Sequence, residues 1–511
     1  MNWTDGYITD LNYTHGYYRE MSPAMLDIAC LCAGVESNLG DQINYLELGF
    51  GQGHSINIHA AATKGCFWGN DFNPAQTVHA LESAAASGAD IHLLDDSFEE
   101  LATRTDLPVF DMIVLHGIWS WVSETHRETI VDIIRRRLRP GGIIYVSYNC
   151  LPGTVPVLPI RQLLTLHQEY GGRAMAGTRN AVDGAVQFSR EFLDADSMYF
   201  KENPSSGRHL QWVLKQDHRY IAHEFLNADW HPLHFSDMAR VLADAKLSFV
   251  GPARLLDRVD ANYLSDAGRK FLASLGHPAL RETVRDYLIN QRFRCDVFIK
   301  GPRIMSEAAQ CQAWQEKQFV LTTCHEDIPK KIAGSLGEMQ LPTKIDPVIE
   351  ALSERRYVPK RLQDLMQHPK LKAMELKEVI ELLMVLMGAG FVSPAQSPTA
   401  ELEPRCRSLN THLSQRALLS PEMLYLASPV TGGGVFVSQG SQLFISALNH
   451  GKMTPDELAI FVWNFLDSAG ERLIMDGQRV ESKEENIRHF TLMAKKFLRD
   501  THPLLAALKI I

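Results

Sequence analysis

The stretch NYLELGFGQGHSINIHAAATKGCFWGNDFNP, residues 44–74, has three glycines in a G-x-G-x-G pattern directly after an apolar run. The apolar run predicts a strand, and the segment after the glycines predicts a helix. An acidic residue, Asp71, follows the glycines by about twenty residues, where a second strand should end. This order is typical of a loop that binds a nucleotide-like ligand at the carboxyl ends of parallel strands. A plain tight turn is the alternative.

The residues around the glycines indicate which ligand the loop would bind. Gly49, Gly51 and Gly53 allow backbone N–H groups to approach a ligand. However, Gly53 comes one residue earlier than in the G-x-G-x-x-G pattern of nicotinamide cofactors. Glu47, just before the glycines, would repel a pyrophosphate and suits a cationic ligand. These features favour S-adenosylmethionine, because Asp71 could accept hydrogen bonds from its ribose hydroxyls.

The flanking sequence predicts the fold class. Ser22 and Pro23 start a helix, because serine is a good N-cap and proline fits the first helical position. Apolar strands then alternate with helices, which indicates a parallel sheet covered on both faces. Two late strands, at 247–253 and 294–301, would complete a seven-stranded Rossmann-like α/β sheet whose last strand is antiparallel. The first five strands are predicted at 43–49, 66–71, 91–96, 110–117 and 142–149.

The length of 511 residues favours two to four domains. The sequence pattern of the C-terminal part predicts mixed α+β structure, and a winged-helix-like module is one interpretation of its helices. A Pro- and Ser-rich linker is predicted at 393–404, and Thr454 with Glu457 forms a capping box. The predicted divisions are a donor-binding Rossmann-like core at 1–156, a helical insertion serving as lid or dimerisation element at 157–217, completion of the sheet as a regulatory region at 218–302, a helical winged-helix-like middle domain at 303–395, and a C-terminal α+β domain at 405–511.

Composition narrows the class of protein. The net charge of −9 and the pI of about 6.1 argue against a nucleic-acid-binding protein that relies on bulk positive charge. The eight cysteines show no C-x-x-C spacing, so neither a disulfide framework nor a structural zinc site is expected. The N-terminus lacks the pattern of a signal peptide, and no apolar run is long enough for membrane insertion. A cytoplasmic protein is expected.

Further ligand-binding residues are predicted at the ends of the second and third strands. Asp96 could accept from an adenine amino group, with Ser97 beside it and Phe98 against the ring. Phe72 could cover the other face of the adenine. A solvated helix cap is the alternative for Asp96 and Ser97, and a core position is the alternative for Phe72.

The reacting end is predicted at the fourth and fifth strands. His116 closes the fourth strand and could act as a general base or only form a hydrogen bond. Trp119 and Trp121 are two residues apart and cannot both face the site, and Trp119 is favoured for the pocket. Tyr148, at the end of the fifth strand, is expected on the acceptor side.

The segment YIAHEFLN, residues 220–227, carries a polar group of Tyr220, His223 and Glu224. Asn227 stands where the H-E-x-x-H zinc motif would need its second histidine, so a zinc site is not expected. The group could lie on the acceptor side, or it could be a buried hydrogen-bonded network.

The motifs ELGFGQG, GNDFNP, DDSFEEL, FDMIVLHGIWSWV and LRPGG resemble those of class I S-adenosylmethionine-dependent methyltransferases. With YTHGYYRE, SYNCLPG and YIAHEFLN, the chain is similar over about residues 7–302 to bacterial methyltransferases with a methyltransferase regulatory domain. Rickettsial lysine methyltransferases of outer-membrane proteins belong to that group.

The resemblance implies an S-adenosyl-L-methionine donor, S-adenosyl-L-homocysteine as product, no metal, a homodimer and a protein substrate with lysine as acceptor. It also implies an N-terminal lid over the donor. Tyr13, Tyr17 and Tyr18 would then contact the donor or orient the acceptor.

The sequence is compatible with three hypotheses. The first is a protein methyltransferase with a deep groove between domains. The second is a small-molecule methyltransferase with a sealed, largely apolar acceptor cavity. The third is a non-catalytic module that binds the donor and signals through the winged-helix-like region.

Overall fold

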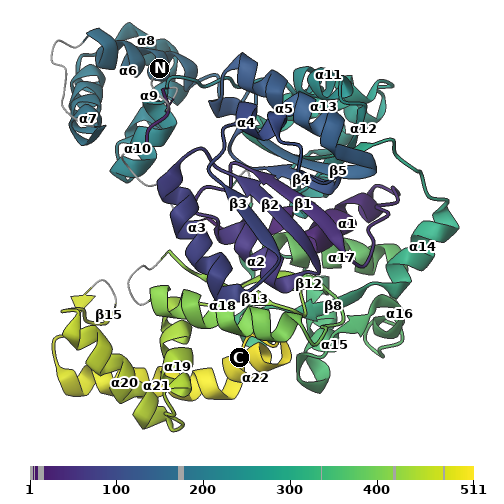
Figure 1. Cartoon of the computed structure of the whole chain (residues 1–511), viewed down its shortest axis with the longest axis vertical. Helices are drawn as coiled ribbons and strands as arrows, with labels where there is room; N and C mark the ends of the chain where they lie inside the picture. Colours follow the sequence, from purple (N-terminus) through teal and green to yellow (C-terminus); the bar gives the residue numbers. More distant parts are fainter. Residues whose placement is uncertain are drawn as a thin grey trace.

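The computed structural model describes residues 4, 6–9, 16–170, 178–334, 337–417, 422–475 and 478–511. Its central element is a seven-stranded sheet of order β3-β2-β1-β4-β5-β7-β6 (Figure 1). β7 runs antiparallel to β5 and β6, whereas β1 to β5 are parallel, so the predicted topology is confirmed. The strands are β1 (Ile43–Leu48), β2 (Gly65–Asn70), β3 (Ile91–Leu94), β4 (Phe110–Leu115), β5 (Leu138–Asn149), β6 (Leu247–Pro252) and β7 (Phe293–Lys300).

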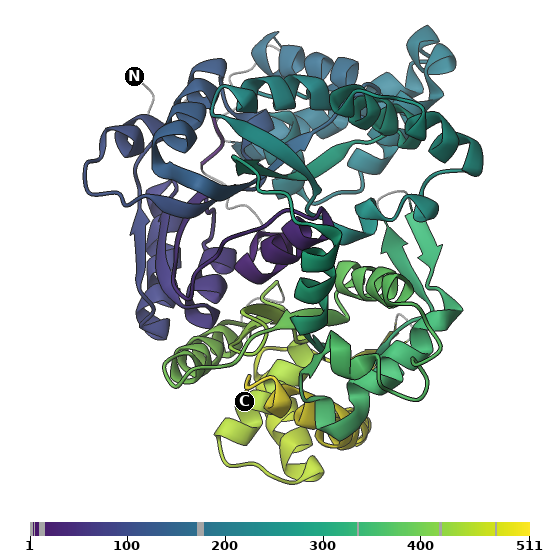
Figure 2. The same ribbon diagram turned by 90° about the vertical axis from the view of Figure 1, so that its right-hand side faces the viewer.

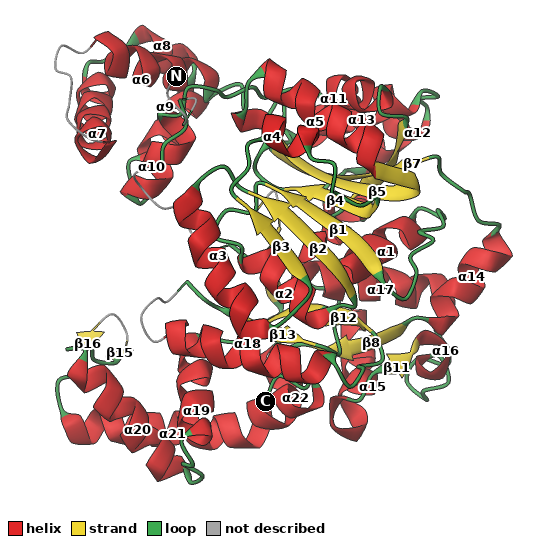
Figure 3. Ribbon diagram, viewed as in Figure 1, coloured by secondary structure: helices red, strands yellow, loops and turns green. Residues whose placement is uncertain are grey.

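Helices cover both faces of this sheet (Figure 3). Successive strand residues point to opposite faces, so Tyr45 packs with the first helical layer and Leu46 with the second. Ser22 caps α1 by accepting from the Met25 N–H, with Pro23 at the first position, as predicted. The first layer is α1 (Pro23–Cys32), α2 (His54–Ala62) and α3 (Pro74–Ser87), and the second is α4 (Phe98–Thr103), α5 (Glu124–Arg137), α11 (Phe235–Ala243) and α13 (Pro278–Ile289), with α12 (Asp266–Ala273) beside α13.

A helical unit is inserted between β5 and β6. It lies at the opposite end of the long axis from the C-terminal domain (Figures 1 and 2). Ile160 and Leu164 share one buried cluster with Ile221 and Phe225 of α10, so the unit extends past the boundary predicted at residue 217. Its helices are α6 (Leu158–Tyr170), α7 (Thr178–Asp194), α8 (Met198–Glu202), α9 (Pro204–Val213) and α10 (His218–Phe225).

The described part of the middle domain combines four helices with a small antiparallel sheet of order β11-β8-β12. One of these helices precedes β8 and three follow it, and the winged-helix-like interpretation of this region stays a prediction. Met25 and Ile28 of α1 belong to its core, so α1 joins this domain to the large sheet. Its elements are α14 (Glu307–Glu316), β8 (Gln318–Leu321), the β9 (Lys331–Gly334) and β10 (Gly337–Gln340) hairpin, α15 (Asp346–Tyr357), β11 (Lys360–Arg361), α16 (Leu362–Leu365), α17 (Leu376–Ala389) and β12 (Val392–Ala395).

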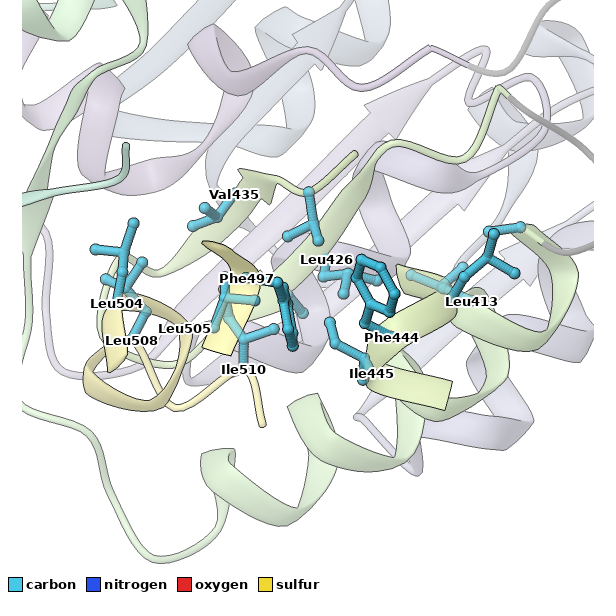
Figure 4. Close-up of a cluster of buried hydrophobic side chains, with 14 of the residues drawn as sticks. Leu413, Leu426, Val435, Phe444, Ile445, Phe497, Leu504, Leu505, Leu508 and Ile510 are labelled. Carbon is cyan, nitrogen blue, oxygen red and sulfur yellow. The ribbon is translucent and has the colours of Figure 1, made fainter. Parts of the chain in front are cut away.

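The C-terminal domain packs directly on α2. Ile58, Ala61 and Ala62 of that helix join the domain's core, part of which is drawn in Figure 4. The predicted hairpin and the Thr454 capping box are present. The expected linker at 393–404 is partly ordered into β12 and the start of α18. The elements are α18 (Leu402–Ala417), β13 (Tyr425–Ser428), β14 (Gly433–Phe436), α19 (Gln439–Asn449), α20 (Pro455–Ser468), β15 (Ile474–Met475), β16 (Gln478–Arg479), α21 (Lys483–Lys496), a π-helical turn (Phe497–Thr501) and α22 (His502–Ala507).

Within the described ranges, no helix is both long enough and apolar enough to cross a membrane.

Candidate functional site

A cavity of about 840 Å³ lies beyond the carboxyl ends of the central strands. It is walled by the strand ends, by the N-terminal segment and by α10 of the helical insertion. Of the residues predicted to bind the donor, those that line it are Glu47, Gly49, Gly51, Asp71, Phe72, Ser97, Phe98 and Tyr18. His116 lines it as well. The strand-end residues that the sequence pattern singled out are therefore brought together around one space.

The glycine loop presents its backbone to this cavity. Gly51 has a φ of 57°, a conformation that side chains disfavour, and its N–H donates to Asp71 Oδ2 at 2.8 Å. The Asn73 N–H donates to the other oxygen of Asp71 at 3.1 Å. Gly53 is placed differently from the prediction, because it lies at the start of α2 and outside the cavity lining. A Cβ there would overlap the Cβ of Ala80, so Gly53 allows α2 to pack closely on α3.

Two buried carboxylates face the cavity. Glu47 is only 3% exposed and Asp71 only 7%. Burial raises the pKa of Glu47 to about 8 and that of Asp71 to about 7. The Tyr45 hydroxyl donates to Glu47 Oε2 at 3.3 Å. A cation in the cavity would offset the desolvation of Glu47, so these residues fit a cationic ligand with a hydroxylated ribose.

The region predicted to hold the adenine is only partly as expected. Phe72, Ser97 and Phe98 line the cavity. Asp96 does not, because its carboxylate pairs with Arg104 at 3.1 Å while its carbonyl oxygen accepts from the Asn70 amide. Ser97 also caps α4, so its helix-cap alternative and its place at the cavity both hold.

His116 lies at the cavity wall with its ring stacked on Tyr18, the ring centroids being 3.6 Å apart. Its Nδ1 lies 2.7 Å from the Tyr145 hydroxyl. Burial, together with the charge of Arg254, lowers the pKa of His116 to about 3. A base this weak is poorly matched to proton abstraction near neutral pH. The hydrogen-bonding alternative therefore fits His116 better than the general-base role.

Trp119 and Tyr148 lie away from the cavity, contrary to the prediction. Trp119 is 1% exposed and packs with α5 in the second helical layer, whereas Trp121 faces the cavity. Tyr148 points to the same face of the sheet, the one that this layer covers, because strand residues alternate. Its hydroxyl donates to Asp296 Oδ2 at 2.7 Å, and Asp296 in turn pairs with the buried Arg294.

Tyr17 is also outside the cavity and packs on the C-terminal domain. Tyr13 lies outside the described residues. Other N-terminal residues do line the cavity, and one of them, Tyr7, was not predicted from the sequence. Its ring lies 5.7 Å from that of Phe72, and the neighbouring Ile8 N–H donates to Asn227 Oδ1 at 3.1 Å. Sequence spacing offered no signal for Tyr7, since its ring contacts, Phe72 and His223, are distant in the chain.

The polar group on α10 does reach the cavity. Tyr220, His223 and Glu224 line it, as do Asn227 and Asp229. The first three of these are spaced i, i+3 and i+4, a pattern that could have identified one helix face from the sequence, and Asn227 follows the end of the helix. Burial raises the pKa of Glu224 to about 7, although Arg161 acts against the rise. Glu224 is thus a carboxylate that exchanges a proton near neutral pH.

A different group, Cys66, Asp90 and His92, could hold a metal ion within the described part of the chain. It lies at the amino ends of β2 and β3, the opposite edge of the sheet from the cavity. It takes no part in the site.

Known proteins match this architecture. A family described as "Methyltransferase domain" matches residues 46–142, and one described as "Predicted methyltransferase regulatory domain" matches residues 217–300. An uncharacterized protein of Synechocystis sp. is 35% identical over 516 residues, covering 100% of both chains. An uncharacterized protein of Rickettsia prowazekii is 24% identical over 294 residues, 54% of this chain and 49% of its own.

Among solved structures, PKMT2 from Rickettsia typhi in complex with AdoHcy superposes with a TM-score of 0.70. The sequence identity is 16%, and the match covers 97% of this chain and 100% of that one. At this identity the likeness shows the fold. Taken with the sheet order, the glycine loop and the full-length relative, these matches show that the chain belongs to the class I S-adenosylmethionine-dependent methyltransferases that carry a methyltransferase regulatory domain.

Proposed function

We propose that this methyltransferase modifies an amine on a protein, a lysine side chain by resemblance, and that Glu224 removes the proton from that amine. The observation that carries the proposal is the position of the Glu224 carboxylate on the wall of the cavity that also holds the buried acids Glu47 and Asp71, and burial there raises the pKa of Glu224 to about 7. The likeness to Rickettsia typhi PKMT2 across the whole chain supports it.

The strand ends would hold the donor. Asp71 is kept in place by the Gly51 and Asn73 N–H groups and has remaining lone pairs for ribose hydroxyls. Glu47 would balance the donor's positive charge. Phe72 and Phe98 offer apolar faces for an adenine ring. When bound, S-adenosylmethionine supplies an electrophilic methyl group.

The α10 side would hold the acceptor. A lysine ammonium, with a reference pKa of about 10.4, must lose a proton before it can act as a nucleophile. Glu224 can accept this proton once it is ionised. Asp229 adds negative charge to this wall, and the Tyr7 and Trp121 rings can contact a cation. This side of the cavity therefore favours a cationic amine.

The alternative of a small-molecule acceptor predicts a sealed, apolar acceptor cavity. The acceptor side here carries carboxylates, tyrosines and a tryptophan. The volume of about 840 Å³ lies toward the upper end of the roughly 300–1,000 Å³ usual for small-ligand sites, which leaves room for a side chain beside a donor. The charged side chains favour a cationic amine, whereas the volume accommodates either kind of acceptor. By resemblance we also expect a homodimer, which light scattering of the purified protein would test.

Calorimetric titration of S-adenosylmethionine into the wild type and into Asp71→Asn tests the donor end. We expect affinity to fall at least about tenfold in Asp71→Asn, because a charged hydrogen-bond acceptor is lost. Asp90→Asn, the same change at the far edge of the sheet, is the matched control and should bind as the wild type does.

Radiolabelled donor incubated with a bacterial lysate then tests the acceptor. Label in the protein fraction that disappears with Glu224→Gln supports the proposal, and label only in small molecules contradicts it. Amino-acid analysis of the labelled protein identifies the residue that is methylated, and methylation of a residue other than lysine would contradict the finer assignment.

A further inference from the structure

Residues 16–21, here called the anchor segment, contact both the cavity and the two C-terminal domains. Gly16, Tyr18 and Met21 line the cavity, and Tyr18 stacks on His116. Tyr18 has extended backbone angles, so the side chains on either side of it point away from the cavity. Those two neighbours are Tyr17 and Arg19.

Tyr17 is held by the C-terminal domain. The Gly434 N–H, at the start of β14, donates to the Tyr17 hydroxyl at 2.6 Å. The same hydroxyl lies 3.3 Å from Nε2 of His59 on α2. The Tyr17 ring packs against Tyr425 of β13, with centroids 4.7 Å apart. The β13–β14 hairpin therefore fixes both the ring and the hydroxyl.

Arg19 is held by the middle domain. Its Nη2 donates to the carbonyl oxygen of Gly388 at 2.6 Å. Gly388 lies near the carboxyl end of α17, where the helix dipole favours a cation. The backbone of the segment is tied to α2 as well, since the Tyr18 N–H donates to Ser55 Oγ at 3.0 Å. Tyr18 thus lies between two residues, Tyr17 and Arg19, each of which is held by a different one of the two C-terminal domains.

We infer that the C-terminal domains hold Tyr18 in place at the donor cavity through Tyr17 and Arg19, so that donor affinity depends on contacts made far from the donor. Tyr17 is then a positioning residue that acts through Tyr18. Because coupling between two sites is reciprocal, a bound donor also stabilises the contact between Tyr17 and the hairpin. The inference rests on the proposed placement of the donor in this cavity.

Two variants loosen the contact from opposite sides. Tyr17→Phe removes the hydroxyl that accepts from Gly434. Gly434→Ala changes only the C-terminal domain, and its Cβ would lie 2.7 Å from Tyr17 Cζ, which forces the ring to move. Their matched controls are Tyr425→Phe, which keeps the ring contact, and Gly440→Ala, whose Cβ would meet Met493 Cε at an ordinary 3.7 Å.

Donor affinity by calorimetry is the first measurement. We expect Kd for S-adenosylmethionine to rise about tenfold in Tyr17→Phe and in Gly434→Ala, the factor that corresponds to one hydrogen bond, and to stay unchanged in both controls. A residue with only a structural role would lower the melting temperature and leave the affinity of the folded fraction unchanged.

Hydrogen exchange of residues 425–436, with and without S-adenosylhomocysteine, is the second measurement. In the wild type the product should slow exchange at this hairpin, and in Tyr17→Phe it should not. Wild-type affinity in Gly434→Ala together with no ligand-dependent protection of the hairpin would overturn the inference. Asp71→Asn separates the two proposals. If Asp71→Asn binds S-adenosylmethionine as tightly as the wild type does, the proposed donor placement is wrong. If Asp71→Asn loses affinity while Tyr17→Phe and Gly434→Ala do not, the donor placement stands and only the coupling is wrong.

Discussion

Replacing Glu47 by glutamine should stabilise the ligand-free protein while weakening the binding of its donor. The pKa of Glu47 rises from 4.5 to about 8 on folding because its carboxylate is buried. A group whose pKa is raised in the folded state stabilises the fold fully below its unfolded pKa, and this contribution is lost as the pH rises toward the folded pKa. At 1.36 kcal/mol per unit, the cost reaches about 3 kcal/mol at pH 7 and about 5 kcal/mol above pH 8.

Glu47→Gln removes this cost because an amide does not ionise. Urea unfolding of the ligand-free proteins, followed by tryptophan fluorescence, should give equal stabilities near pH 4.5 and a difference that grows by about 1.4 kcal/mol per pH unit up to about pH 8. Saturating S-adenosylmethionine should reverse the order, since a cation pairs with the ionised glutamate only. A stability difference that does not change with pH, or donor affinity equal to that of the wild type, would refute the reasoning.

The remaining predictions concern the acceptor side and the two misplaced aromatic residues. At saturating donor, the rate of methyl transfer should rise with pH through about 7 as Glu224 ionises, and in Glu224→Gln it should be low without that step, while donor affinity measured by calorimetry at one fixed pH should equal that of the wild type. Trp121→Ala should lower transfer with little loss of stability, whereas Trp119→Ala should cost about 3–5 kcal/mol of stability measured by urea unfolding, and the opposite ranking would contradict their placement. Tyr148→Phe should cost about 1–3 kcal/mol by leaving Asp296 short of a donor, and a change in donor Kd would show that Tyr148 contacts the site after all.

The strand-end residues could be predicted because local sequence decides them. A G-x-G-x-G turn after an apolar strand, and an acid at the end of the next strand, place Gly51 and Asp71 at one edge of any parallel sheet. The side chains that follow the strands were less predictable. Strand alternation turns Tyr148 to the sheet face that packs on α5 and α11. In the 3-10 turn at 119–121 it is Trp121, and not Trp119, that faces the cavity, so the predicted choice between the two tryptophans is reversed.

The acceptor wall depended on contacts between distant parts of the chain. Tyr7 and Glu224 are separated by more than two hundred residues, and only the docking of the insertion against the N-terminal segment brings them to the same cavity. No local pattern records such docking, since each segment is an ordinary amphipathic or irregular piece by itself.

By itself, the sequence determined the sheet, its order and the class of donor, because strand periodicity, turn glycines and the acids beside them act over short distances along the chain. Only the tertiary structure decided that the C-terminal domain buries the outer side of α2, that the pKa of Glu47 and Glu224 rises, and that Tyr17 belongs to an interface. These properties come from burial and from contacts between remote segments, and both exist only once the chain is folded.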